Sequence, residues 1–179
     1  MAWKSDKTRY GAVARAMHWI TAFALVAMIG SGLAAEAASG EAAAVNILRF
    51  HAVTGVAVLA LTVLRILWWV LADRRPADTA QTPRWQSLAA HGVHYAFYLV
   101  IILLAGSGIA TIALSGAGDI LFGSETGALP RFEDFQPRGP HGFFAWATVG
   151  LVALHIAAAL YHQFVIKDRL LERMGLGRA

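Results

Sequence analysis

Cysteine is absent from the 179-residue sequence, and charged residues are scarce. Without a thiol the chain cannot form a disulfide bond, ligate an iron–sulfur cluster through cysteine or attach a haem covalently. Only 15% of the residues are charged and 58% are hydrophobic, whereas an ordinary soluble domain carries about 25% charged residues. This composition excludes a typical soluble domain and indicates a membrane protein.

Four apolar runs of spanning length are present, and the connections between them are too short to form a separate soluble core. A bilayer core of about 30 Å is crossed by roughly 20 helical residues at 1.5 Å per residue. The expected fold is therefore all-α, a bundle of four transmembrane helices forming one domain over residues 1–179. The helices are expected at about residues 15–36, 47–72, 84–115 and 140–168.

The basic residues gather in the segments that would lie on one side of the membrane. These segments precede the first run, follow the second and follow the fourth, whereas the other side is mostly acidic. Basic loops stay in the cytoplasm, so we expect both termini there. The net charge of +4 is thereby explained by topology, and we expect no binding to nucleic acid. The residues on the basic side are Lys4, Lys7, Arg9, Arg15, Arg74, Arg75, Arg84, Lys167, Arg169, Arg173 and Arg178.

The first run also has features of a secretory signal peptide, because a basic start and an apolar stretch lead into the small-residue segment 32–38. Cleavage there would leave three spans and break the charge pattern. It would also remove His18, an imidazole for which a signal peptide has no use. We therefore expect the first run to be retained as a span.

The connections differ in length and character. We expect a short outer loop over residues 36–46 and an inner connection over 73–82, where Pro76 and its charged neighbours end the second helix. The longest connection, residues 115–140, is rich in glycine and contains three phenylalanines. These side chains would either fold the loop onto the membrane surface as a lid or anchor it to lipid headgroups.

Histidines interrupt the fourth run, which has no charged residue between Phe143 and Ile166. An imidazole in hydrocarbon is costly without a partner, so such a residue indicates a functional site. Fourteen residues separate His141 from His155. This is close to four helical turns, so both rings leave the same helix face about 21 Å apart. Two levels of ligands on one face are typical of a bundle that holds two haems.

The outer level contains only two histidines, His51 and His141, so a bis-histidine iron there must use both. At the inner level five histidines compete for two positions. Among them His155 lies deepest and is the strongest candidate, with His18 or His94 as its partner, between which spacing does not choose. Two histidines on each iron leave no open position, which favours electron transfer over oxygen binding. The inner histidines are His18, His91, His94, His155 and His162.

Arg65 lies fourteen residues after His51 and so shares its helix face at the inner level. Its guanidinium would either bind a haem propionate or extend to the headgroups. Arg15 and Arg49 are weaker propionate candidates. Three cations on the outer side would attract a small anionic electron donor. They are Arg49, Arg131 and Arg138.

Several motifs together resemble those of a known family. They are Ala16-Met17-His18-Trp19, residues 49–55 with Arg65, residues 88–94, and His141 followed by residues 150–162 and Lys167-Asp168. The chain resembles, over nearly its whole length, the bacterial cytochrome b561 family of four-helix dihaem proteins of the inner membrane, which includes superoxide oxidases.

The resemblance implies two non-covalent haem b groups. It assigns the inner haem to His18 and His155, and thereby settles by analogy the partner that spacing leaves open. It assigns the outer haem to His51 and His141.

The resemblance also implies electron exchange with a quinone. His94 and His162 match family positions outside the ligand set, where an imidazole near the quinone would supply a proton. We therefore expect a cytochrome that passes electrons from an outer donor, superoxide, to ubiquinone in the membrane. The long outer loop departs from the family pattern, so the resemblance does not decide the identity of the electron donor. No catalytic residue is assigned.

Two other functions compete with this one. The chain would be a non-catalytic cytochrome b subunit that anchors and serves a redox partner protein, such as a dehydrogenase or hydrogenase. Alternatively it would be a haem-free scaffold or small transporter, which a missing Soret band would indicate.

Overall fold

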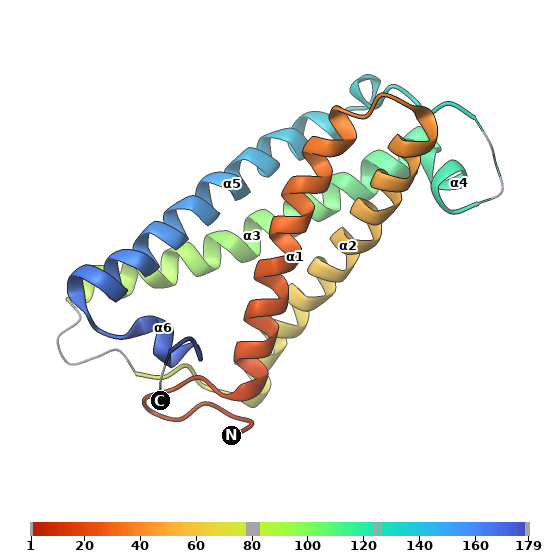
Figure 1. The fold of residues 1–179 in the computed structure, drawn as a ribbon. Coiled ribbons are helices and arrows are strands. Elements are labelled where there is room, and N and C mark those ends of the chain that lie inside the picture. The colour runs from red at the N-terminus through yellow and green to blue at the C-terminus, as the bar shows by residue number, and fades with distance from the viewer. Residues whose placement is uncertain (1, 78–82, 124, 126, 178–179) are drawn as a thin grey trace.

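The computed structural model describes residues 2–77, 83–123, 125 and 127–177, and within them every regular element is a helix. Four long helices run side by side (Figure 1), which confirms the expected bundle. They are α1 (Ala12–Glu36), α2 (Glu41–Leu67) with its π-helical extension η1 (Trp68–Ala72), α3 (Arg84–Ser115), and α5 (Arg138–Tyr161) with its π-helical extension η3 (His162–Ile166). The short elements are α4 (Ala117–Phe122), the 3₁₀ turn η2 (Phe132–Asp134) and α6 (Leu170–Arg173).

Each long helix is apolar and long enough to cross a membrane, with lengths of 25, 32, 32 and 29 residues when the π-helical extensions are included. Large apolar side chains cover the outside of the bundle, as expected for a surface that faces lipid. Both chain termini lie at one end, here named the terminus end, and α4 lies at the other, named the α4 end (Figure 1). The charge pattern predicts that the terminus end is cytoplasmic.

The helices pack as two pairs, α1 with α2 and α3 with α5, and the pairs meet along α2 and α3. The pairs spread apart toward the terminus end, where α6 lies between them (Figure 1). At the α4 end, α4 packs against α2 and α3 and closes the bundle there.

Each long helix has a buried residue near its midpoint, and four of these residues are named here the middle layer: Leu25, Val58, Ile101 and Thr148. Leu25, Val58 and Ile101 form the apolar core cluster, against which Met28 and Phe97 pack. Because the interior is filled at mid-depth, the bundle has two separate levels above and below this layer at which polar residues can gather.

Residues 73–77 and both chain ends form a hydrogen-bonded cap at the terminus end. Arg173 donates from Nε to the Thr8 carbonyl at 2.9 Å and from Nη2 to the Ala77 carbonyl at 2.8 Å. Trp19 Nε1 donates to the Met174 carbonyl at 3.0 Å. The C-terminal segment therefore holds the N-terminal segment and the α2–α3 connection in place.

Two connections differ from the sequence prediction. The predicted outer loop 36–46 is wrong beyond Gly40, because α2 begins at Glu41. Alanines are strong helix formers, and an acidic residue in the first turn interacts favourably with the helix dipole. The predicted loop 115–140 contains α4, whose Ala117 and Leu121 are buried. Gly116 makes this possible, since its φ of +71° ends α3 in a left-handed turn.

Candidate functional site

Two polar layers flank the middle layer, and each contains one residue from every long helix. Seven residues correspond to almost two helical turns, so a step of seven along a helix returns to the same face. The α4-side layer consists of Gly32, His51, Gly108 and His141. The terminus-side layer consists of His18, Arg65, His94 and His155. All six histidine and arginine members were singled out from the sequence.

In the α4-side layer the structure brings His51 of α2 and His141 of α5 together. Their ring centroids lie 6.3 Å apart. The Nδ1 of His141 lies 3.0 Å from the Leu104 carbonyl, which can only accept, so Nδ1 carries the proton and Nε2 keeps its lone pair. Ser31 donates its hydroxyl proton to the Met28 carbonyl and therefore accepts from Nδ1 of His51 at 2.9 Å. Both rings thus have the tautomer that binds a metal through Nε2.

The other two helices each place a glycine directly against one of the rings. A Cβ atom on Gly108 would lie 2.9 Å from Cε1 of His141, and one on Gly32 would lie 3.4 Å from Cε1 of His51. Side chains at these positions would displace or crowd the rings. The two rings can therefore lie directly against the backbones of α1 and α3, because no side chain stands at Gly32 or Gly108.

In the terminus-side layer three imidazoles meet. The ring centroid of His155 lies 6.1 Å from that of His18 and 5.6 Å from that of His94. Phe97 packs edge-on against His155. His94 donates from Nδ1 to the Ala90 carbonyl of its own helix at 2.6 Å, so its Nε2 also keeps a lone pair.

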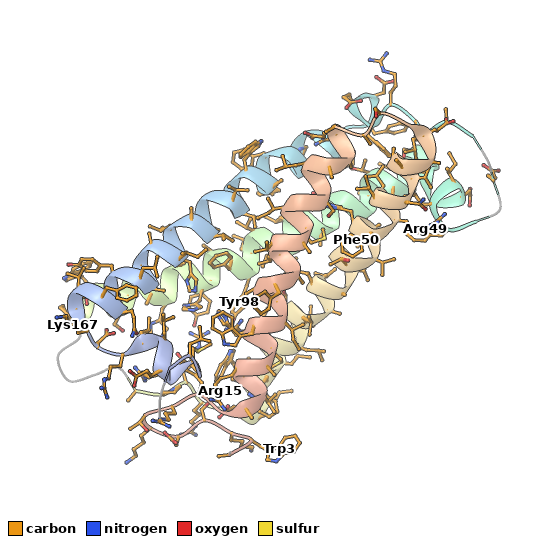
Figure 2. The ribbon with its side chains drawn as sticks, in the orientation of Figure 1. Trp3, Arg15, Arg49, Phe50, Tyr98 and Lys167 are labelled. Carbon is orange, nitrogen blue, oxygen red and sulfur yellow. The ribbon has the colours of Figure 1, made fainter. Side chains whose placement is uncertain are left out.

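Arg65 lies at this level, as predicted, and donates from Nη1 to Nδ1 of His18 at 3.2 Å. A guanidinium has no acceptor, so Nδ1 of His18 accepts and a neutral ring carries its proton on Nε2. Among the described residues, the buried Nε of Arg65 and the buried hydroxyl of Tyr98 have no hydrogen-bond partner. Figure 2 shows Tyr98 in the half of the bundle nearer the termini. Two unsatisfied buried groups indicate a site built for a further polar partner.

The number of protein ligands at each level favours a metal bound in a macrocycle over a bare metal ion. In the part of the chain that the structure describes, no three His, Cys, Asp or Glu side chains are placed so that together they could hold a bare metal ion. Two imidazoles bound on opposite sides of one metal through bonds of about 2.0–2.1 Å have ring centroids about 6.3 Å apart. The separations of 6.3 Å for His51–His141 and 6.1 Å for His18–His155 match this value. A haem supplies the remaining ligands itself, so both pairs fit it.

The other predicted residues have different surroundings. Arg49 donates from Nε to the Leu121 carbonyl at 2.6 Å and so holds α4 against α2, and Figure 2 shows it at that end of the bundle. Arg15 lies beside the C-terminal segment, with Nη1 2.8 Å from the place of a Cβ on Gly175. Arg138 pairs with Glu36 at 2.8 Å on the surface. His91 donates from Nδ1 to the Ser87 carbonyl at 2.7 Å.

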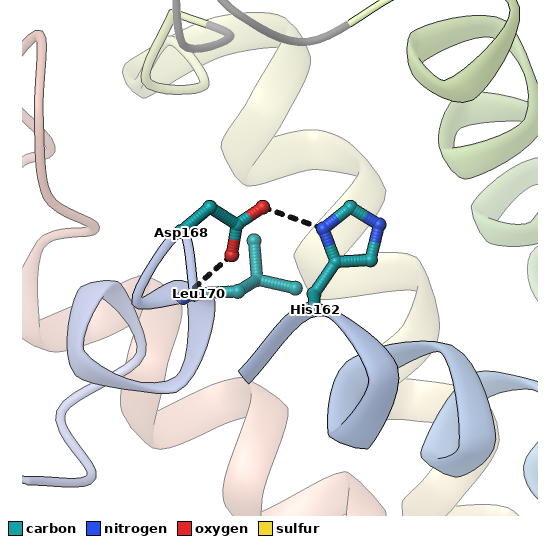
Figure 3. A network of polar contacts seen from close by, with 3 residues as sticks. All are labelled: His162, Asp168 and Leu170. Atoms are coloured by element: carbon teal, nitrogen blue, oxygen red, sulfur yellow. Dashed lines mark hydrogen bonds and ion pairs between the residues drawn. The ribbon is translucent and has the colours of Figure 1, made fainter. Parts of the chain in front are cut away.

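His162 lies outside both layers and forms an ion pair or hydrogen bond with Asp168 (Figure 3). The second carboxylate oxygen of Asp168 accepts from the Leu170 amide at 3.2 Å. Lys167 and Arg169 have φ values of +62° and +61°. These left-handed residues on either side of Asp168 turn the chain back so that its carboxylate reaches the imidazole. Among the described residues, no hydrogen bond, ion pair or ring contact joins His94 to His162.

Sequence reasoning missed Gly32, Gly108 and Ser31, which support the α4-side rings, and Tyr98 in the other half. The seven-residue step was available as a signal, since Gly32 follows His18 by fourteen residues and Gly108 follows His94 by the same number. A glycine on a helix face nevertheless indicates only that something approaches closely, and the neighbouring helix decides what that is.

Comparison with known sequences gives consistent matches over the whole bundle. A family model described as prokaryotic cytochrome b561 matches residues 9–177. Cytochrome b561 homolog 2 of Escherichia coli (strain K12) is 28% identical over 188 aligned residues, covering 100% of this chain and 97% of the relative. The probable superoxide oxidase CybB of Yersinia pestis is 32% identical, covering 69% of this chain and 72% of the relative. Cytochrome b562 of Cereibacter sphaeroides is 33% identical, with coverages of 69% and 65%.

Proposed function

The chain belongs to the prokaryotic cytochrome b561 family, and from this premise we propose that it holds two haem b groups, one in each polar layer. Membership makes the protein a multi-pass, haem-binding electron-transfer protein of the bacterial inner membrane. The observation that carries the proposal is the pair of imidazole separations, 6.3 Å and 6.1 Å, at two levels of one bundle.

In the α4-side layer, His51 and His141 are the residues that would hold the haem iron. Ser31 and the Leu104 carbonyl fix the orientation of these rings through Nδ1, and such outer partners also set the tautomer. Gly32 and Gly108 allow these rings to lie against α1 and α3.

In the terminus-side layer, His18 and His155 are the proposed ligands. The alternative partner, His94, is 5.6 Å from His155 between ring centroids, which is closer than the separation of about 6.3 Å that a shared metal requires. The hydrogen bond from His94 to the Ala90 carbonyl also holds that ring against its own helix. His94 is then a neighbour of the haem and not its ligand.

Arg65 is proposed to bind a propionate of the terminus-side haem. Coordination through Nε2 of His18 needs the proton on Nδ1, the nitrogen to which Arg65 donates in the structure. Arg65 must therefore release His18 when haem binds, and a carboxylate is the partner that a guanidinium prefers. Arg15 and Arg49 remain weaker candidates of the same kind, and Arg49 would first have to leave the Leu121 carbonyl.

Haem coordinated by two histidines supplies one-electron transfer without an open site for oxygen. The residues of the chain complete the proposed function. The apolar core cluster separates the two levels, and the exposed Arg131 would offer a small anionic donor a cation at the α4 end. We propose superoxide as that donor, because one relative bears the name probable superoxide oxidase.

Ubiquinone is the proposed acceptor at the terminus end. Beside it, His162 would transfer a proton, with Asp168 orienting the imidazole through Nδ1. His94 would be the second imidazole near that acceptor.

Two measurements test the function. A pyridine haemochrome assay with protein quantification should give two b haems per chain. Stopped-flow mixing with superoxide should then reduce the haems faster than superoxide dismutates, and added ubiquinone should reoxidise them. Haems that stay oxidised would exclude superoxide as the donor. If the purified protein shows no turnover by itself and a soluble redox protein co-purifies with it, the alternative function would be favoured. That alternative is an electron-transfer subunit that anchors a dehydrogenase or hydrogenase.

A further inference from the structure

A pocket of about 670 Å³ lies at the terminus end between the α2–η1 helix and α3. It is separate from the proposed ligand pairs, since none of the four histidine ligands lines it. Its walls contain two adjacent arginines, Arg74 and Arg75, together with His91 and Tyr98. The pocket therefore combines positive charge with hydrogen-bonding side chains at the depth where a membrane helix ends.

The two arginines have no carboxylate partner among the described residues, although a carboxylate lines the same pocket. That carboxylate, Asp73, accepts hydrogen bonds from the Ser5 amide and hydroxyl, Trp68 Nε1 and the Arg74 amide at 2.8–3.1 Å. Its oxygens are thus occupied by neutral donors of the chain. The positive charge of both guanidinium groups remains available to a ligand.

Arg75 is held in place before any ligand binds. Its guanidinium carbon lies 5.7 Å from the centre of the Trp69 ring and 5.5 Å from that of Tyr95. These cation–π contacts come from the two sides of the pocket, η1 and α3, and they restrict the side chain. A restricted arginine loses less entropy on binding an anion than a free one does.

The rim of the pocket opens onto the surface that faces lipid. Val70, Tyr95 and Leu99 line it and are 72%, 61% and 59% exposed, and all three belong to membrane-spanning segments. A ligand with a charged head and an apolar tail fits this arrangement. A free anion in water would gain nothing from the apolar rim, and a neutral quinone would not need two cations.

We propose that this pocket binds the phosphate of an anionic phospholipid. Basic pockets between transmembrane helices at the headgroup level are suited to such lipids. Arg74 and Arg75 contact the phosphate, and the acyl chains lie along Val70 and Leu99.

The test uses the full-length protein purified in detergent and stripped of lipid. Native mass spectrometry and thermal unfolding are recorded with phosphatidylglycerol, phosphatidylcholine, inorganic phosphate and a short-chain ubiquinone as separate additions. Phosphatidylglycerol should remain bound and raise Tm, whereas phosphatidylcholine and inorganic phosphate should not. Equal effects of phosphate and phosphatidylglycerol would overturn the lipid assignment, and a ubiquinone effect without a lipid effect would assign the pocket to the quinone.

Variants locate the effect in the pocket. Each basic residue near a membrane surface contributes about 1 kcal/mol to binding of anionic lipid, so Arg74→Gln should weaken phosphatidylglycerol about fivefold and the double variant with Arg75→Gln about 25-fold. Arg84→Gln removes the same charge from the same end of the bundle outside the pocket and should leave affinity unchanged. Arg74 is exposed, so the single variant should fold even if the double variant does not. Equal losses in Arg74→Gln and Arg84→Gln would contradict the proposal.

Discussion

Gly108 of α3 lies directly against the imidazole of His141 on α5. A Cβ atom at Gly108 would come within 2.9 Å of Cε1 and 3.1 Å of Nδ1 of that ring. The contact explains why a helix otherwise rich in large apolar side chains has a glycine at this point. The position of the His141 ring, a proposed haem ligand, therefore depends on a residue of another helix.

Gly108→Ala should reduce haem content from two groups per chain toward one. The added methyl group forces the His141 ring away from His51, and the pair then no longer has the separation that a shared metal requires. The pyridine haemochrome assay and the Soret spectrum measure the loss. Gly106→Ala is the matched control, because a Cβ there meets nothing within 4 Å. Equal haem contents in the two variants would show that the α4-side haem does not depend on the His141 ring.

Single histidine replacements should remove one haem and leave the other. His51→Ala should eliminate the α4-side haem and His18→Ala the terminus-side haem, because each pair occupies its own side of the middle layer. Redox titration should show one remaining midpoint potential, different in the two variants.

His94→Ala distinguishes the two possible partners of His155. It should keep both haems if His18 is the ligand. Loss of one haem in His94→Ala with retention of both in His18→Ala would reverse that assignment.

Arg65→Gln should weaken retention of the terminus-side haem by about tenfold to a hundredfold. This corresponds to loss of a charge-assisted hydrogen bond of about 1.5–3 kcal/mol. Haem transfer to apomyoglobin measures the release rate. Arg65→Lys should restore only part of the affinity, since an ammonium group cannot make the two parallel hydrogen bonds of a guanidinium. Release as slow as in the unmodified protein would mean that no propionate depends on Arg65.

Asp73→Asn should destabilise the terminus end at neutral pH. Burial alone would raise the pKa of Asp73, but the hydrogen bonds from Ser5, Arg74 and Trp68 outweigh it and hold the pKa below its ordinary value. A lowered folded-state pKa gives stability that is complete above the unfolded value, about 3.9, and is lost as the pH falls through the folded value. The gap in Tm between the two proteins should therefore be widest at neutral pH, correspond to about 1–3 kcal/mol, and begin to narrow only below about pH 4.

Thermal unfolding between pH 3 and 7 measures this gap. Asp134→Asn, at an exposed carboxylate, serves as the control and should behave like the unmodified protein. A gap that stays constant with pH would show that the effect of Asp73→Asn does not come from the charge of this carboxylate.

The sequence by itself determined what depends on a single helix. Composition and run length specified four membrane-spanning helices, because the rise per residue is fixed and hydrocarbon requires satisfied backbone groups. The same regularity put His141 and His155 on one face of α5, and His51 and Arg65 on one face of α2. These relationships hold in whatever way the helices are arranged around one another.

Only the tertiary structure decided what depends on how one helix is rotated and shifted against the next. It brought His18, His94 and Arg65 to the same depth as His155, placed Gly108 against His141, and aligned the middle layer. Spacing within a helix has no information about these relations, since they arise from side-chain packing between elements far apart in sequence. The helix α4 was missed for a related reason, because burial of Ala117 and Leu121 against α2 and α3 stabilises a segment that its glycine-rich sequence alone indicates as loop. The start of α2 at Glu41 is different, since its alanines and its acidic first residue favour a helix locally.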